Sequence, residues 1–238
     1  MGKYEEVANL LLEYMKSTGE GRISEPGRTQ PPVSGMRVTG VPASERPGSE
    51  LQIPVGISNR HVHLSQADLD ALFGCGYCLT PIKDLSQLGQ YACRETLTVC
   101  GPKGVIEKLR ILGPVRSQTQ VEILAGDCFK LGVKAEPRLS GDLAGTSGVT
   151  LVGPKGSVRT SEGVIIAKRH IHMHPSDAWQ FSVRDGETVK IAVDGPRGGI
   201  FHDVSIRVTE ESSLEFHLDT EEANALGVTS WTVIRIVR

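Results

Sequence analysis

The chain has few aromatic residues, no run of basic residues and no long apolar stretch, and each shortage excludes a class of protein. Phe, Trp and Tyr make up 5% of 238 residues, so a core has to be built mainly from aliphatic side chains. A net charge of −2 with scattered arginines does not provide a nucleic-acid-binding surface. No apolar stretch could span a bilayer, and no signal-peptide pattern is visible at the N-terminus. We therefore expect no nucleic-acid partner and no membrane association.

Cysteine is also scarce. The five cysteines are odd in number and lack the regular spacing of a disulfide framework, which is typical of proteins from a reducing cytosol. Cys75 and Cys78 form a Cys-x-x-Cys, but neither a second pair nor a helix start accompanies them. We interpret that spacing as a coincidence in a loop.

The most informative feature that is present is a repeat. Residues 55–68 (VGISNRHVHLSQAD) return as residues 164–177 (VIIAKRHIHMHPSD). Each copy has the pattern of one apolar strand that ends in Arg-His-x-His and leads into a short helix. Surface histidines have no reason to recur in register, although a repeated strand and helix could also be kept for packing alone. The duplication favours a functional role for the histidines.

Each histidine pair can supply half of a metal site. Successive side chains of a strand point to opposite faces, so His61 and His63 share one face, as do His170 and His172. Neutral imidazole is a common zinc ligand, whereas a single His-x-His is more often two ordinary half-exposed histidines. Two pairs in duplicated units predict either one binuclear centre or two separate centres. His174 occupies the helix-capping position that Ser65 has in the first copy, which favours capping over metal binding.

Two metal ions need more than four imidazoles, because each ion takes at least three protein ligands and keeps one position open for substrate. Glu122 lies in the apolar run QVEIL, where a buried carboxylate is costly unless it is paired or binds metal. His217 lies similarly in LEFHL. Arg116, in a loop of small and polar residues, could bind phosphate or carboxylate in bidentate fashion. The alternatives are an exposed strand position for Glu122 and a solvated loop for Arg116.

The chain divides into three parts by composition. Residues 1–17 have an apolar stripe at helical spacing, and residues 18–50 are rich in Gly, Pro, Ser and Arg, as in a flexible linker. The helix is expected to dock on another protein, the alternative being that it packs back on the body. From residue 51 onward short β-branched runs alternate with turns, three of which are Gly-Pro-(Lys/Arg)-Gly hairpins. We expect strands at residues 97–99, 105–112, 121–124, 149–152, 158–159, 164–167, 189–193, 204–208, 213–218 and 231–237. The pattern predicts a mainly β fold of two small β-barrels capped by short helices.

Several motifs together resemble one family. The paired Arg-His-(Val/Ile)-His segments, the stretch GPVRSQTQVE and the run LEFHLDTEEAN are similar to the phosphate propanoyltransferases, the phosphotransacylases associated with bacterial microcompartments. The resemblance covers roughly residues 51–238. It implies one barrel domain at residues 51–59 plus 168–238 and another at residues 60–167. Cys75, Cys78 and His174 depart from the family pattern, and none is an expected ligand.

The resemblance also implies a site and a reaction. It implies two Zn²⁺ per chain, with ligands His61, His63 and Glu122 for one ion and His170, His172 and His217 for the other. The open position of the first ion would meet the sulfur of coenzyme A, and Arg116 would bind phosphate. The implied reaction is reversible: acyl-CoA plus phosphate gives acyl phosphate plus coenzyme A, with propanoyl or acetyl as the acyl group.

Residues 1–17 are similar to the encapsulation peptides of microcompartment enzymes. We therefore expect a cytoplasmic protein inside a bacterial microcompartment, in propanediol or other aldehyde-generating catabolism, that contacts shell or core proteins. We also expect a homo-oligomer, a dimer. Two other functions are compatible with the same residues: a dizinc hydrolase of thioesters or phosphoesters, and a non-catalytic, shell-associated scaffold stapled by zinc.

Overall fold

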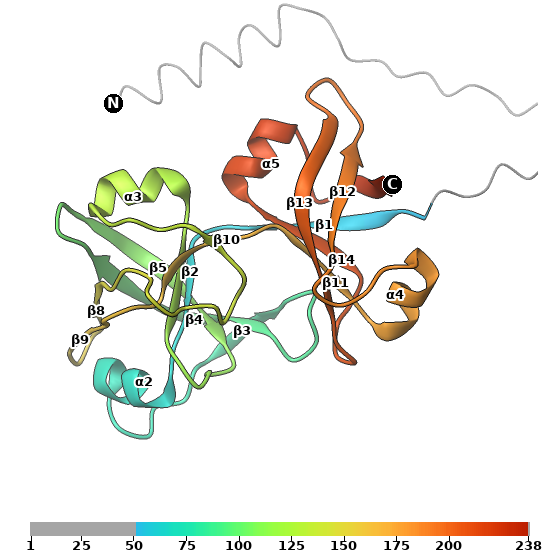
Figure 1. Ribbon diagram of the computed structural model, residues 1–238. Coiled ribbons are helices and arrows are strands. Elements are labelled where there is room, and N and C mark those ends of the chain that lie inside the picture. The colour runs from blue at the N-terminus through green and yellow to red at the C-terminus, as the bar shows by residue number, and fades with distance from the viewer. Residues whose placement is uncertain (1–50, 238) are drawn as a thin grey trace, which may run out of the picture. The chain divides into compact units, whose positions relative to one another are not determined.

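A computed structural model describes residues 51–237 of the chain (Figure 1). The helix expected at residues 1–17 and the linker expected at residues 18–50 lie outside the described residues. The mainly β fold class is confirmed, with one closed barrel and one curled half-barrel sheet. Within residues 51–237 no helix has the length and apolar character needed to cross a bilayer.

Six strands close into a barrel in the order β1-β14-β11-β13-β12-β15. Their bounds are β1 (Ile53–Ser58), β11 (His170–Met173), β12 (Thr188–Val193), β13 (Gly199–Val208), β14 (Glu215–Asp219) and β15 (Val233–Val237). Mostly aliphatic side chains fill its core around the fully buried Phe216. Helices α4 (Pro175–Phe181) and α5 (Thr220–Leu226) add Phe181 and Leu226 to the same core. The barrel therefore has the aliphatic interior that the composition predicts.

Nine strands form the second sheet, in the order β7-β10-β6-β2-β5-β4-β8-β9 with β3 paired to β4. Their bounds are β2 (His61–His63), β3 (Pro81–Asp84), β4 (Tyr91–Cys100), β5 (Val105–Gly113), β6 (Gln120–Ile123), β7 (Pro137–Arg138), β8 (Thr150–Val152), β9 (Ser157–Arg159) and β10 (Val164–Ala167). Helices α2 (Gln66–Phe73) and α3 (Ala125–Leu131) bury Leu69, Leu72 and Leu131 in its core. All ten predicted strands coincide with or overlap observed ones, whereas β3, β7 and α3 were not predicted. The division into two domains stays a prediction.

Each copy of the repeat is two short strands, which corrects the prediction of a single strand. In the first copy β1 ends at Ser58 and β2 begins at His61; in the second β10 ends at Ala167 and β11 begins at His170. The same local contact lies at both breaks: the backbone carbonyl two residues before the first histidine contacts that histidine's Nδ1 at 2.7 Å.

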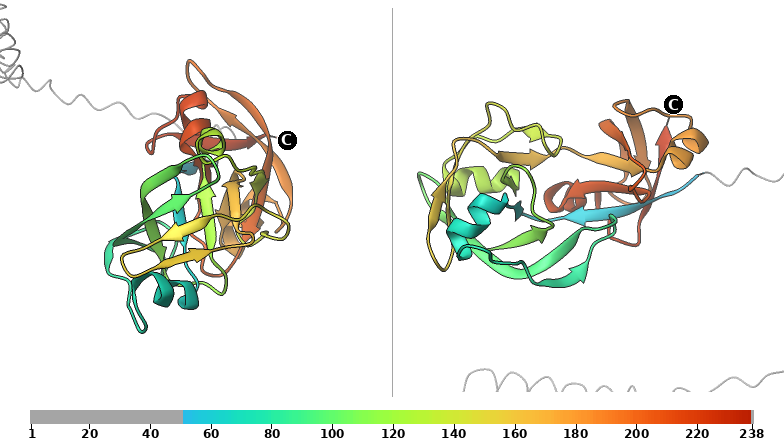
Figure 2. Two further views of the ribbon diagram at one scale, coloured as in Figure 1. Left: turned by 90° about the vertical axis from the view of Figure 1, so that its left-hand side faces the viewer. Right: turned by 90° about the horizontal axis from the view of Figure 1, so that it is seen from below.

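The break lets the chain pass from one sheet to the other. Strand β1 belongs to the barrel and β2 to the half-barrel, whereas β10 belongs to the half-barrel and β11 to the barrel. The right-hand view of Figure 2 shows these two crossings as the blue and gold segments. Both Arg-His-x-His motifs therefore lie where the two sheets adjoin.

The three Gly-Pro-x-Gly turns connect β4 to β5, β8 to β9 and β12 to β13, which confirms the predicted hairpins. Each turn meets the C-terminal end of a helix, where carbonyl groups lack partners within the helix. The donor and acceptor pairs are Lys103 N to Leu131 O at 3.0 Å, Lys155 N to Leu72 O at 3.0 Å and Arg197 Nη1 to Asn224 O at 2.7 Å. A Cβ atom at Gly101 would lie 2.2 Å from the Leu131 carbonyl oxygen, so this approach requires glycine.

Candidate functional site

Glu122 and His217 occupy equivalent places in the two sheets. Strand β6 runs antiparallel to β2 and places Glu122 opposite His61, and β14 runs antiparallel to β11 and places His217 opposite His170. On their other sides Glu122 adjoins Ile165 and His217 adjoins Gly56, which are matching positions of the repeat. The duplication thus extends to a third side chain in each half. Sequence comparison of the two copies cannot show this, since one half uses Glu and the other His.

The first cluster consists of His61, His63 and Glu122, with ligand atoms within 4.8 Å of one another. All three side chains are buried. Nδ1 of His61 contacts the Asn59 carbonyl, which leaves Nε2 facing Glu122 Oε2 at 3.4 Å. Within the described residues, Nδ1 of His63 is buried without a hydrogen-bond partner. A buried imidazole nitrogen without a hydrogen-bond partner, in a cluster that also contains a carboxylate, suits a bound cation.

Electrostatics hold two of the three side chains, His63 and Glu122, in the protonation state that a metal ligand needs. Burial, reinforced by His61, lowers the pKa of His63 to about 3, so its imidazole is neutral at pH 7. Burial alone would lower the pKa of His61 and raise that of Glu122, but their mutual attraction reverses both directions. The pKa of Glu122 is thus held below its usual range and the carboxylate stays ionised. The cost of burying the Glu122 carboxylate is therefore offset by its pairing with His61.

The second cluster consists of His170, His172 and His217, also with ligand atoms within 4.8 Å of one another. Nε2 of His170 lies 3.0 Å from Nε2 of His172. Burial, with His217 next, lowers the pKa of His170 to about 4, and burial with His170 lowers that of His172 to about 2. His217 also contacts Glu215 through Nε2. Three imidazoles around one point are a donor set that zinc accepts.

Both clusters line one cavity of 340 Å³, so the structure brings together all six predicted ligands. Arg110, Arg116 and Arg207 line it as well. His174 lies apart from both clusters and caps α4, accepting a hydrogen bond from Ser176 N at 3.2 Å, as predicted. Cys75 and Cys78 are exposed in the loop after α2. Neither contributes to the cavity.

The arginine that precedes each histidine pair contacts a helix. Arg60 Nε lies 2.7 Å from Asp127 Oδ2 at the start of α3, and Arg169 Nη1 lies 3.3 Å from Glu222 Oε1 at the start of α5. Asp127 and Glu222 each follow the third cluster residue by five positions, so these ion pairs are duplicated too. They fix each β-crossing against the helix of its own half.

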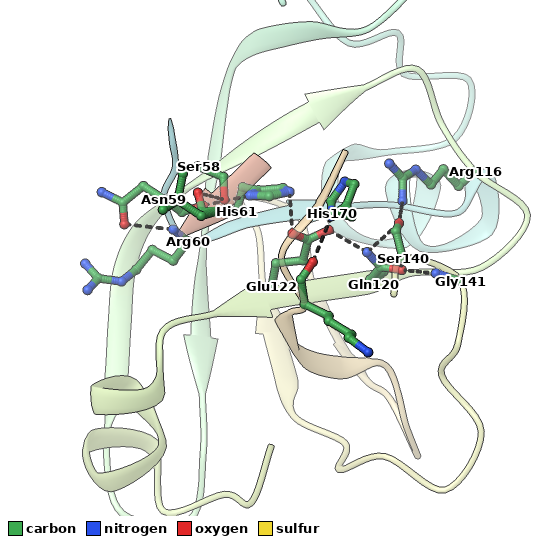
Figure 3. Close-up of polar contacts among 12 residues, drawn as sticks. Ser58, Asn59, Arg60, His61, Arg116, Gln120, Glu122, Ser140, Gly141 and His170 are labelled. Carbon is green, nitrogen blue, oxygen red and sulfur yellow. Dashed lines mark hydrogen bonds and ion pairs between the residues drawn. The ribbon is translucent and has the colours of Figure 1, made fainter. Parts of the chain in front are cut away.

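Arg116 is half-buried at the cavity wall. Its backbone N–H donates to Leu64 O at 2.9 Å, and its Nη1 donates to Ser140 Oγ at 2.7 Å. Gln120 Nε2 donates to Ser140 Oγ at 2.9 Å and to Glu122 Oε1 at 2.6 Å (Figure 3). A continuous chain of hydrogen bonds therefore joins Arg116 to the first cluster. Burial and the nearby Arg207 both lower the pKa of Arg116, and only Glu122 opposes them.

The sequence alone did not indicate four residues of this site. Gln120 lies two positions before Glu122 on β6, so strand alternation could have placed it on the same face. Arg207 lies beside His172 in the parallel register of β11 and β13, and Glu215 lies two positions before His217. Ser140 comes from the connection between β7 and β8, where no strand pattern could have indicated it.

Comparison with known proteins decides the family. A family model described as phosphate propanoyltransferase matches residues 54–229. The chain belongs to the phosphate propanoyltransferase family. A phosphate propanoyltransferase from Thermotoga maritima is 57% identical over 189 residues, which are 79% of this chain and 90% of that protein. Relatives of the same name from Rhodobacter capsulatus and Rhodopseudomonas palustris are 53% and 50% identical, over 77% and 79% of this chain and 86% and 83% of theirs. The residues matched by the phosphate propanoyltransferase family model include both clusters and Arg116.

Proposed function

We propose that the protein transfers a propanoyl or acetyl group reversibly between coenzyme A and phosphate: acyl-CoA plus phosphate gives acyl phosphate plus coenzyme A. One observation carries the proposal. In a chain of this family, two clusters with metal-binding donor sets and a half-buried arginine face the same cavity. The names of the relatives specify a propanoyl group and phosphate.

Two zinc ions are the cofactors that these donor sets suit. His61, His63 and Glu122 would hold one ion, and His170, His172 and His217 would hold the other. When bound, zinc supplies positive charge that stabilises a thiolate and polarises a carbonyl group. The Asn59 and Lys168 carbonyls fix the rings of His61 and His170 so that Nε2 of each faces its cluster. The unsatisfied nitrogen of His63 supports the same assignment.

Arg116 would hold the attacking phosphate. A phosphate oxygen forms a bond to the acyl carbonyl carbon, the carbon–sulfur bond breaks, and coenzyme A leaves as a thiolate. Ser140 and Gln120 orient the guanidinium, so the phosphate is bound by a positioned charge. No cysteine is among the described residues that line the cavity, which supports direct attack rather than an acyl-cysteine intermediate.

The decisive experiment measures coenzyme A release from propanoyl-CoA and acetyl-CoA with and without phosphate, together with the metal content. Phosphate-dependent release by a protein with two zinc ions is the expected result. Arg116→Ala should lower turnover by about two to three orders of magnitude with unchanged metal content. Release that does not need phosphate would identify a thioesterase. No release, with metal that cannot be exchanged, would identify a zinc-stapled scaffold.

The cellular setting is a further part of the proposal. The helical pattern of residues 1–17 and the linker composition of residues 18–50 support an encapsulation peptide on a tether, and hence a location inside a cytoplasmic microcompartment. Shell or core proteins would be its partners, and the enzyme would be a dimer. Fusion of residues 1–50 to a fluorescent protein tests this, since recruitment to shells is expected only when residues 1–17 are present.

A further inference from the structure

A second arginine faces the site from the other half of the protein. Arg207 lies on β13, in register with His172 on the neighbouring β11, so both side chains leave the same face of the barrel sheet. Arg116 comes from the segment after β5 in the other sheet. The two guanidinium groups therefore approach one place from opposite halves of the fold.

That place is the junction of two cavities. The 340 Å³ cavity contains both clusters, and a second cavity of 380 Å³ extends from the same wall. Arg116, Ser140, His172 and Arg207 line both. The second cavity contains no other histidine of the clusters, and most of its remaining lining is polar. A small anion at the junction could contact both arginines while the 340 Å³ cavity holds another ligand.

Among residues 51–237 no carboxylate forms an ion pair with either guanidinium group at the junction, although the charge of Glu122 acts on Arg116. Arg116 donates to a neutral hydroxyl, that of Ser140, and among residues 51–237 no hydrogen bond or ion pair engages the Arg207 guanidinium. Arg207 also lowers the pKa of Arg116, as expected of like charges in a partly desolvated site. The carboxylate of Glu211, which lines the second cavity, is exposed. Two guanidinium groups that share a cavity wall, neither of them in an ion pair, would be stabilised by an anion between them.

We infer that Arg207 is a second phosphate-binding residue and forms, with Arg116, a two-arginine clamp at the junction of the two cavities. The inference rests on the proposed function for the identity of the anion, inorganic phosphate. The clamp would let phosphate bind while acyl-CoA occupies the 340 Å³ cavity that contains both clusters. Arg116 and Arg207 each contribute one guanidinium, so loss of either should weaken phosphate binding more than acyl-CoA binding.

The test varies one substrate at a time in the zinc-loaded full-length protein. Arg207→Gln should raise the KM for phosphate about ten-fold or more and change the KM for propanoyl-CoA less than two-fold. Arg207→Lys keeps the charge but loses the planar fork, and an intermediate effect is expected. Arg184→Gln, which removes an exposed arginine from the connection between α4 and β12, is the matched control. An unchanged KM for phosphate in Arg207→Gln, or equal increases for both substrates, would overturn the clamp.

Calorimetric titration with inorganic phosphate separates this inference from the proposed function. Wild-type protein should bind phosphate, and Arg207→Gln should bind it about ten-fold or more weakly, whether or not coenzyme A is released in the assay. If the wild type binds phosphate and the variant binds it equally well, the clamp is wrong. If binding weakens as expected but no acyl transfer occurs, the clamp stands and the proposed reaction fails. Should Arg207→Gln not fold, Arg207→Lys decides, and wild-type phosphate affinity in that variant would refute the bidentate role.

Discussion

Acidification of the metal-free protein should destabilise it steeply between pH 7 and pH 5. The folded state keeps His63, His170 and His172 neutral, with pKa values lowered from 6.5 to about 3, 4 and 2. In the unfolded chain each imidazole takes up its proton with a pKa near 6.5. Below that value the unfolded state binds more protons than the folded state, so the free energy of unfolding falls as the pH falls.

The magnitude follows from linkage. Between pH 7 and pH 5 an unfolded imidazole goes from about one-quarter protonated to almost fully protonated, which is worth about 2 kcal/mol for each buried neutral histidine. Three of them give about 6 kcal/mol, which is comparable with the whole stability of many domains. His61 acts in the opposite direction, because its raised pKa contributes stability that is fully present below pH 6.5. The lowered pKa of Glu122 contributes stability that is lost only below pH 4.5.

Urea unfolding followed by circular dichroism, in EDTA at pH 7, 6 and 5, measures this dependence. The variant His172→Gln isolates one histidine. Its free energy of unfolding should fall by about 2 kcal/mol less than that of the wild type between pH 7 and pH 5. Equal decreases in both proteins would show that His172 is not kept neutral by its surroundings, and the electrostatic reasoning for the second cluster would be wrong.

Three further changes test other parts of the structure. Gly153→Ala should lower the free energy of unfolding by about 1–3 kcal/mol, because the new Cβ would lie 2.5 Å from the Leu72 carbonyl oxygen. The control is Gly199→Ala, whose Cβ would lie 3.6 Å from its nearest neighbour. In the same thermal or urea titration its free energy of unfolding should stay within about 0.5 kcal/mol of the wild-type value. Glu122→Gln should leave about one zinc ion per chain instead of two by metal analysis after dialysis, since it removes the only anionic ligand; two retained ions would contradict the ligand assignment. Ser140→Ala should lower kcat/KM for phosphate about ten-fold, because it frees the Arg116 guanidinium, and unchanged kinetics would show that Ser140 does not position it.

The sequence indicated the strands by their local alternation and four of the six cluster residues by the repeat, whereas Glu122 and His217 became candidates because they interrupt apolar runs. It did not indicate the break within each copy, at which a carbonyl contacts a ring nitrogen two residues later. Helix α3 was missed because its N-cap is Leu124, without a capping side chain, and Asp127 satisfies the Leu124 N–H from within the helix. The N-cap side chain that most clearly indicates a helix start is therefore absent there, although Asp127 is an acidic residue in the first turn.

The sequence also did not indicate residues that reach the site only through the pairing of strands or through contacts distant in the chain. Arg207 faces the junction only because β13 runs parallel to β11 with Arg207 beside His172. Ser140 reaches Arg116 from a connection 24 positions away in the chain. Neither position carries a local pattern that distinguishes it from a solvated loop or strand residue. Such residues become candidates only when the neighbouring strands are known.

Divergence between the two halves gives the site its chemistry. The backbone N–H of Arg116 donates to Leu64 O, and at the matching place in the other half Thr209 N donates to Met173 O, so the first half carries the guanidinium where the second has a hydroxyl. Glu122 brings a negative charge that its counterpart His217 lacks. The first ligand set therefore includes a carboxylate, whereas in the second half the carboxylate of Glu215 contacts His217 from outside the ligand set. A cavity with such unequal ends can hold a thioester and an anionic phosphate in different places, which direct transfer between them requires.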